Sequence, residues 1–218
     1  MPAVFSPRAN LIARASIALG LLLVCGAGVI AYAYINSSYY NDVNVEIDQP
    51  VPFSHEHHVG GLGIDCRYCH ASVEESAFAG MPASETCMGC HSKLWTRADL
   101  LEPIRSSWQT GTPVRWRRVN VLPDFVYFNH AIHINKGIGC GSCHGPVDKM
   151  PLMRKYATLN MRWCIACHRN PEPQVRPRDR IFDVSWKPAA TSADVSQLRY
   201  DTYDIRSENI TDCSTCHR

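Results

Sequence analysis

The chain lacks an excess of charge of either sign, and cysteine and histidine are almost absent outside a few repeated motifs. Its 218 residues carry 22 Lys and Arg against 20 Asp and Glu, a formal net charge of +2, so no basic surplus favours binding to nucleic acid. Eleven cysteines are present, and all except Cys25 form Cys-x-x-Cys pairs. No cysteine is therefore left outside these pairs once the apolar N-terminal segment is set aside.

Five Cys-x-x-Cys pairs are each followed directly by a histidine, which is the attachment pattern of c-type haem. One helical turn brings both thiols to the two vinyl groups of a single haem, and the next residue can present its imidazole to the iron. We expect five covalently bound haem c groups, attached at Cys66 and Cys69, Cys87 and Cys90, Cys140 and Cys143, Cys164 and Cys167, and Cys213 and Cys216. The proximal iron ligands would then be His70, His91, His144, His168 and His217.

Zinc binding and disulfide formation are the alternative uses of such pairs. The 17 residues between Cys69 and Cys87 and the 20 between Cys143 and Cys164 fit the spacing of a four-cysteine zinc site. Zinc does not require a histidine after each pair, however, and it would leave the fifth pair without a partner. Disulfides within the pairs would leave all five histidines unexplained. The pattern therefore favours haem.

The sequence predicts a mainly α fold with short helices, extensive irregular loops and little sheet, packed around five covalent haems. Five groups would leave the segment after residue 36 with about 36 residues each, and each porphyrin is itself a large apolar body that the protein can surround. The 14 prolines and 13 glycines agree with this picture. The haem propionates would make the loaded protein net negative, which again argues against nucleic acid as a partner.

Residues 15–35 carry no charge and are long enough to span a bilayer as a helix. Arg8 and Arg14 precede them, and basic residues flanking a span stay in the cytoplasm. A cleaved signal peptide with its site near Ala31-Tyr32-Ala33 is the alternative. A lipoprotein signal ending at Cys25 is disfavoured by the bulk of Val24.

The predicted organisation is a single-pass protein of the cytoplasmic membrane. We expect residues 1–14 to lie in the cytoplasm, residues 15–36 to form a transmembrane anchor helix, and residues 37–218 to form an extracytoplasmic, periplasmic pentahaem domain. Residues 169–212 open with several prolines and show no helical period. We interpret them as an extended arm that precedes the fifth haem motif.

The five remaining histidines lie in two clusters that form an internal repeat. Phe53-Ser54-His55-Glu56-His57-His58 and Phe128-Asn129-His130-Ala131-Ile132-His133 each stand a similar distance before a haem motif. One histidine of each cluster can serve the haem just downstream, and the other can reach a neighbouring haem. His57 breaks the repeat, and we expect it to support a ligand rather than bind iron. We expect the distal ligands to be His55, His58, His130 and His133.

Four distal histidines leave one of five irons open to a methionine. Methionine ligation raises a haem's reduction potential relative to two histidines. Met150, on a loop after the third motif, and Met161, three residues before Cys164, are the first candidates. Met153, Met81 and Met88 follow them, and packing against a haem is the alternative role for each.

The motifs and their surroundings resemble the pentahaem cytochrome c subunit of alternative complex III. The resemblance covers roughly residues 15–218 and is carried by Phe53–His70, Phe78-Ala79-Gly80-Met81-Pro82, Glu85–His91, Leu122–His130 and Asn160–Arg169. It implies a subunit of a quinol-oxidising membrane complex, alongside iron–sulfur and integral membrane quinol-binding subunits. It also implies electron transfer to a soluble cytochrome c, a copper protein or a terminal oxidase. The extra His57 departs from this family's pattern.

The expected function is electron transfer without bond chemistry of the chain's own, in a respiratory or photosynthetic complex. Haems with two axial ligands change valence without changing ligands, which suits a row of electron carriers. Two alternatives remain. One is a stand-alone multihaem quinol dehydrogenase feeding a reductase, and the other is a multihaem reductase with one open iron site.

Overall fold

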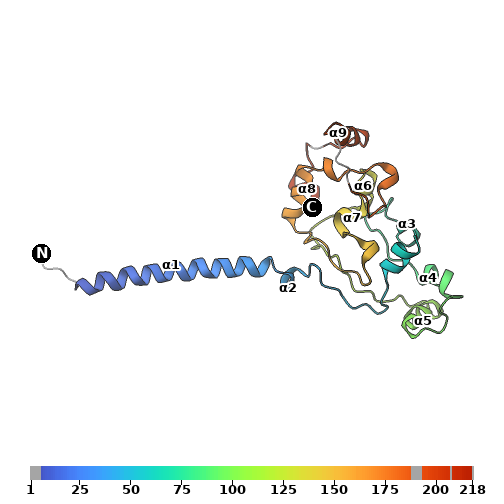
Figure 1. Cartoon of the computed structure of the whole chain (residues 1–218), viewed down its shortest axis with the longest axis horizontal. Coiled ribbons are helices and arrows are strands. Elements are labelled where there is room, and N and C mark those ends of the chain that lie inside the picture. The colour runs from blue at the N-terminus through green and yellow to red at the C-terminus, as the bar shows by residue number, and fades with distance from the viewer. Residues whose placement is uncertain (1–5, 188–192, 207, 218) are drawn as a thin grey trace. The chain divides into compact units, whose positions relative to one another are not determined.

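The protein is described by a computed structural model that covers residues 6–187, 193–206 and 208–217. Residues 1–43 and 44–218 form two separate compact units. The first unit contains the long helix α1 (Pro7–Ile35) and the single-turn helix α2 (Ser38–Asn41). Figure 1 shows the second unit as a set of short helices joined by loops.

Helix α1 is longer than the sequence analysis predicted, because it begins at Pro7 rather than at residue 15. Proline is well suited to the first helical position, since its missing N–H would have no partner there. The 29 residues make a helix about 43 Å long. Within Arg8–Ile35 an 18-residue window has a mean hydropathy of 2.2, and the helix is long and apolar enough to cross a membrane. A signal sequence would meet the same criteria.

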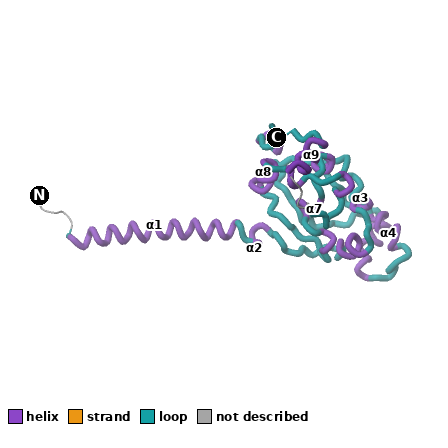
Figure 2. The backbone as a smooth tube through the Cα atoms, turned by 45° about the horizontal axis from the view of Figure 1, so that its top comes forward, coloured by secondary structure: helices purple, strands orange, loops and turns teal. Residues whose placement is uncertain are grey.

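The second unit is helical, as predicted, and its helices are short. They are α3 (Cys66–Cys69), α4 (Ser84–His91), α5 (Glu102–Thr110), α6 (His130–Asn135), α7 (Cys140–His144), α8 (Met161–Arg169), α9 (Ala193–Thr202) and α10 (Cys213–Cys216). A π-helical turn, η1 (Glu56–Gly61), and four 3₁₀ turns, η2 (Asp99–Leu101), η3 (Val147–Lys149), η4 (Glu172–Gln174) and η5 (Arg178–Arg180), lie between them. Figure 2 shows no strand in the part of the chain that is described, where the pairing is limited to two isolated bridges.

The side-chain core is divided into three small clusters. One joins Val51, Met88, Leu101 and Ile104, the second joins Val73, Ile134 and Ile181, and the third joins Val175, Tyr200 and Tyr203. Among the described residues, only Met150 and Val175 have large side chains with less than 2% of their surface exposed. Clusters of this size leave most of the interior to be filled by something other than side chains.

The segment 169–212 differs from the extended conformation expected of it. It contains the ten-residue helix α9 as well as the short turns η4 and η5. All four of its prolines precede α9 in the sequence, so nothing in residues 193–202 opposes a helix. Tyr200 and Tyr203 pack on Val175, which fixes this helix to the segment before it.

Candidate haem-binding sites

All five Cys-x-x-Cys pairs lie on single turns of α-helix. The first, third and fifth pairs occupy α3, α7 and α10 almost entirely, and the second and fourth lie in the last turns of α4 and α8. The local sequence favours these turns, because Asp65 and Asn160 cap α3 and α8 by accepting hydrogen bonds from Arg67 N and Trp163 N. A helical turn places the two sulfurs of each pair on one side, as thioether attachment to one haem requires.

The two histidine clusters share the same arrangement of aromatic rings. The Phe53 ring stacks on His58 with centroids 4.4 Å apart and meets His55 edge-on at 4.8 Å. In the second cluster Phe128 stacks on His133 at 4.5 Å and meets His130 edge-on at 4.8 Å. The repeat in the sequence is thus a repeat of a side-chain arrangement, in which one phenylalanine holds two imidazoles.

Three histidines of these clusters face histidines of Cys-x-x-Cys-His motifs. The ring centroids are 6.2 Å apart for His58 and His91, 6.4 Å for His130 and His144, and 6.1 Å for His133 and His168. An iron bound by two imidazoles would hold their centroids about 6 Å apart, from metal–nitrogen bonds of ~2.0 Å and a nitrogen-to-centroid distance of about 1.1 Å on each side. The three spacings therefore fit a haem iron between each pair.

His55 is the fourth distal candidate, and its nearest charged neighbours are again histidines. Burial lowers the pKa of His55 to about 4, and His70 contributes next, followed by His58 and His144. Its Nδ1 is buried without a hydrogen-bond partner in the described structure. Burial also lowers the pKa of His133, and that of His144 to about 4. Neutral imidazoles are the form that binds iron.

The second ring nitrogen of most of these histidines is held by a backbone carbonyl. Nδ1 lies within hydrogen-bonding distance of a carbonyl oxygen in seven of them: His58 to Ser54 at 2.9 Å, His70 to Gly80 at 2.7 Å, His91 to Leu94 at 3.2 Å, His130 to Ala77 at 2.8 Å, His133 to Asn129 at 2.7 Å, His168 to Ile210 at 2.6 Å and His217 to Phe125 at 3.1 Å. An Nδ1–H that donates to a carbonyl leaves Nε2 free to bind a metal. These contacts therefore fix the orientation of the rings and leave Nε2 available.

The Nδ1 atom of His144 is held by a side chain instead of a backbone carbonyl. Asn120 Nδ2 lies 3.1 Å from His144 Nδ1, while Asn120 Oδ1 is buried without a partner. Turning the Asn120 amide over, an assignment that a hydrogen-bond network decides, lets Oδ1 accept from His144 Nδ1–H. One rotation then satisfies both groups and leaves His144 Nε2 free to bind a metal.

Comparisons with known proteins agree with this geometry. A family model described as cytochrome c7 and related cytochrome c matches residues 126–218, which hold the third, fourth and fifth motifs. The menaquinone reductase, multiheme cytochrome c subunit, of Nitratidesulfovibrio vulgaris is 32% identical over 144 residues, covering 56% of this chain and 69% of that protein. The chain belongs to the multihaem cytochromes c. Membership of this family implies covalently bound haem c as the cofactor.

The fifth motif of this multihaem cytochrome differs from the other four. Among the described residues, the one ring in contact with His217 is Phe125, with centroids 5.7 Å apart.

Of the two methionines predicted as ligands, Met150 is completely buried, whereas the Met161 side chain is 63% exposed at the start of α8. Burial and then the nearby Cys216 raise the pKa of Cys164, so the fourth and fifth motifs are neighbours. Met161 lies one turn before Cys164.

His57 occupies the position of Ile132 in the repeat and does not shift its register. The irregularity lies downstream, because seven residues separate His58 from Cys66 and six separate His133 from Cys140. The π-helical turn η1 accommodates the extra residue, with Leu62 N bonded to His57 O. The His57 ring lies 6.1 Å from that of Trp95, stacked, and 5.2 Å from that of His58.

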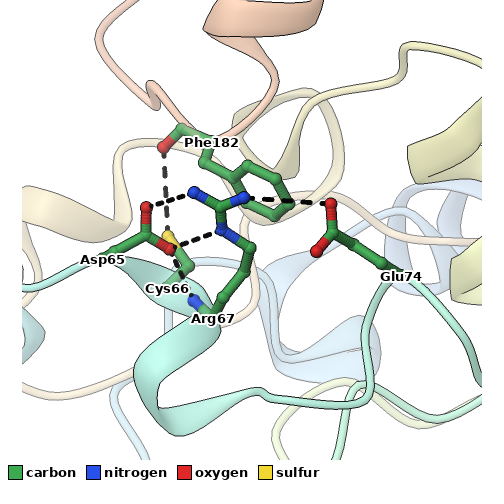
Figure 3. Close-up of polar contacts among 5 residues, drawn as sticks. All are labelled: Asp65, Cys66, Arg67, Glu74 and Phe182. Atoms are coloured by element: carbon green, nitrogen blue, oxygen red, sulfur yellow. Dashed lines mark hydrogen bonds and ion pairs between the residues drawn. The ribbon is translucent and has the colours of Figure 1, made fainter.

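The first motif is held to the segment before α9 by a cluster of polar contacts (Figure 3). Arg67 makes an ion pair with Asp65 at 2.9 Å and a longer one with Glu74 at 3.9 Å. Its guanidinium lies 4.4 Å from the centre of the Phe182 ring, and Cys66 Sγ is 3.9 Å from Phe182 O. Arg67 is one of the two variable residues within the Cys-x-x-Cys spacing, and the sequence analysis did not identify this role.

The sequence analysis also missed Arg176, a buried arginine beside the third motif. A Cβ atom on Gly139 would meet its guanidinium, and one on Gly141 would lie 3.2 Å from Nη2, so the two glycines flanking Cys140 leave it room. Arg176 is 4% exposed, donates from Nη1 to Asp183 O, and has no partner for Nε in the described structure. Burial lowers its pKa.

Replacing Arg176 by glutamine is expected to lower the midpoint potential of the haem at the third motif. A nearby positive charge stabilises the reduced, more negative form of a haem. The expected shift is some tens of millivolts, where about 59 mV is a tenfold change for a one-electron couple. Arg176→Lys keeps the charge and serves as the matched control in a spectroscopic redox titration. Equal shifts in both variants would contradict the electrostatic role.

Proposed function

We propose that this multihaem cytochrome c carries five haems and is the electron-transfer subunit of a quinol-oxidising membrane complex related to alternative complex III. The haem domain, residues 37–218, would lie on the periplasmic side of the cytoplasmic membrane, and helix α1 would be a single-pass anchor with its N-terminus inside. Partners would be iron–sulfur and integral membrane quinol-binding subunits. The acceptor would be a soluble cytochrome c, a copper protein or a terminal oxidase.

The observation that carries this proposal is the pairing of imidazoles. Three histidine pairs with centroids 6.1–6.4 Å apart, together with His55 near His70, offer two axial ligands to each of four irons. Haem iron, when bound, supplies one-electron oxidation and reduction. The imidazoles fixed by backbone carbonyls would keep the ligand set unchanged between the two valences. This arrangement supports electron transfer rather than a reductase, which needs an iron with an open position.

Each of the ten motif cysteines and each proximal histidine would serve the haem of its own motif. His55 and His130 would be distal ligands of the first and third haems, and His58 and His133 those of the second and fourth. Met161 would be the distal ligand of the fifth haem, because its side chain is exposed on the helix that carries the fourth motif. Met150 would be a packing residue, since a side chain with no exposed surface cannot face a haem-sized space.

A second candidate is the opposite direction of electron flow. The relative from Nitratidesulfovibrio vulgaris is named as a subunit of a menaquinone reductase, so this chain could deliver electrons to a quinone-binding partner. Offering the isolated membrane complex either a reduced quinol with an oxidised carrier protein, or a quinone with a reduced carrier protein, separates the two directions. Faster reaction from quinol to carrier favours the main proposal.

We expect the intact chain to weigh five haem c groups more than its polypeptide, and its haems to be reduced by quinol only within a larger complex. The measurements are mass spectrometry of the denatured protein and anaerobic addition of quinol to two preparations, the detergent-extracted chain alone and the mildly solubilised membrane complex. Reduction of the isolated chain by quinol would instead support a stand-alone quinol dehydrogenase. A smaller added mass would reject the pentahaem assignment.

A further inference from the structure

The spatial neighbours of each haem motif can be worked out from the chain's own contacts, and they do not follow the order of the sequence. The first step concerns the two histidine clusters. His55 and His58 lie three residues apart on one turn of chain, and the His58 ring faces that of His91 with centroids 6.2 Å apart. The hydroxyl of Tyr68, within the first motif, lies 3.5 Å from the position of a Cβ atom on Gly89, within the second. The first motif therefore lies beside the second. His130 and His133 face His144 and His168 in the same way and link the third motif to the fourth.

The second step is the contact between the first motif and the third. Val73, three residues after His70, packs in one cluster with Ile134 and Cys140. Cys66 Sγ lies 3.9 Å from Phe182 O, and Phe182 packs on the same cluster as Cys140.

The backbone joins the same two parts of the molecule. His130 N donates to Ala77 O at 3.2 Å, and Ala131 N donates to Ser76 O at 3.1 Å. The segment that follows the first motif is therefore bonded directly to the helix that supplies the distal ligands of the third and fourth.

The third step concerns the fifth motif, which lies beside the fourth. His168 Nδ1 is 2.6 Å from Ile210 O, three residues before Cys213. Tyr127 N donates to Cys216 O at 2.8 Å, which places the last helical turn against the segment just before the second histidine cluster.

The fourth step concerns the second motif, which has few contacts with the others. Its helix α4 contacts α5, and Cys87 and Met88 belong to the cluster of Val51, Leu101 and Ile104, which includes no residue of the third, fourth or fifth motif. Its one link to another motif in the described contacts is to the first, through the turn that carries His58 and through Tyr68, whose hydroxyl lies 3.5 Å from the position of a Cβ atom on Gly89.

We propose that the motifs follow one another in space in the order second, first, third, fourth, fifth, so that bound haems form one unbranched row. Its two ends, the second and fifth motifs, are where electrons enter and leave, and the first and third motifs form the central pair. This inference rests on the proposed function in that each motif carries a haem. This spatial order cannot be obtained from the sequence. A row that followed the order of the sequence would place the second motif, not the first, beside the third.

The test compares three double variants in which two haems are marked by exchanging a distal histidine for methionine. His55→Met with His130→Met marks the first and third haems. His58→Met with His130→Met marks the second and third. His55→Met with His58→Met marks the first and second, which are neighbours in both orders, and is the positive control. Each marked haem is followed in a redox titration by its changed optical signature, either the near-infrared methionine–iron band or, where methionine does not bind, a high-spin band.

Reducing one haem adds a negative charge that makes an adjacent haem harder to reduce, and the effect is screened with distance. In the first double variant, reduction of one marked haem should make the other about tenfold harder to reduce, about 59 mV for a one-electron couple, relative to the two single variants. In the second double variant each marked haem should keep, within error, the midpoint potential that it has in its single variant. The positive control should show the coupling.

A larger coupling between the second and third haems than between the first and third would overturn the proposed order. Mass spectrometry of each variant counts the haems independently. A missing haem mass would count against the pentahaem assignment, whereas a full complement with the wrong coupling pattern would reject only the order.

Discussion

Replacing Met161 by alanine is expected to abolish the near-infrared methionine–iron band of the oxidised protein and to produce a high-spin signal from one haem. The reason is that the fifth motif has no second imidazole opposite its histidine. His217 faces none among the described residues. Met161 lies one helical turn before Cys164, which is a neighbour of Cys216, and its side chain is 63% exposed. Without its thioether the fifth iron would lose its sixth ligand.

Met161→His tests the same ligand assignment by changing the type of ligand. A histidine should restore a low-spin six-coordinate iron while lowering its midpoint potential, because methionine ligation favours the reduced state more than histidine does. The expected shift is on the order of 0.1 V, a fraction of the ~0.8 V that axial ligands span. Electron paramagnetic resonance and a redox titration measure the two effects.

Met150→Ala is the matched control for the ligand assignment. Met150 is completely buried, so its truncation should cost about 2–5 kcal/mol of stability and leave the near-infrared band in place. If the band survives in Met161→Ala and disappears in Met150→Ala, the two roles must be exchanged. If it survives in both, neither methionine binds iron.

Gly60→Ala is expected to destabilise the protein by about 1–3 kcal/mol, although residue 60 is exposed. Gly60 lies in η1, and a Cβ atom there would meet the backbone carbonyl oxygen of Asp148 in η3 at a distance that real Cβ atoms do not show. Backbone cannot rotate away as a side chain can, so the two turns must separate. The hydrogen bond from Glu56 N to Met150 O, 3.1 Å long, crosses the same contact and would be lengthened when the turns separate.

The neighbouring glycine supplies the control. A Cβ on Gly61 would lie 3.7 Å from Glu56 O, an ordinary contact, so Gly61→Ala should leave stability unchanged or slightly increased. Thermal unfolding of the haem-loaded protein, followed by haem absorbance, measures both. Equal unfolding temperatures for the two variants would show that the contact between η1 and η3 is loose.

Much of this architecture could be predicted from the sequence because the haem motif is a local signal. The spacing of each Cys-x-x-Cys pair requires one helical turn, and the low number of residues per motif predicts short helices rather than a sheet. The internal repeat likewise showed that His55 and His58, and His130 and His133, belong together. These inferences depend on residues that are close in the sequence.

Contacts between distant segments could not be predicted in the same way. Nothing in residues 66–70 or 140–144 indicates that Cys66 lies beside Phe182, which packs on the same cluster as Cys140. The proposal of Met161 rather than Met150 as a ligand likewise depends on burial, which the sequence does not contain. Helix α9 was missed because the prolines before it suggested an extended arm, although they end before the helix begins.

The three small side-chain clusters have a consequence for how the protein is made. A polypeptide whose described residues include only two large, fully enclosed side chains gains too little from its own packing to hold a fixed shape before the porphyrins are joined to it. Maturation would therefore begin with a loose, protease-sensitive precursor whose thiols stay accessible to the ligation machinery. Each attachment would then build part of the interior, so that biosynthesis and folding become one process.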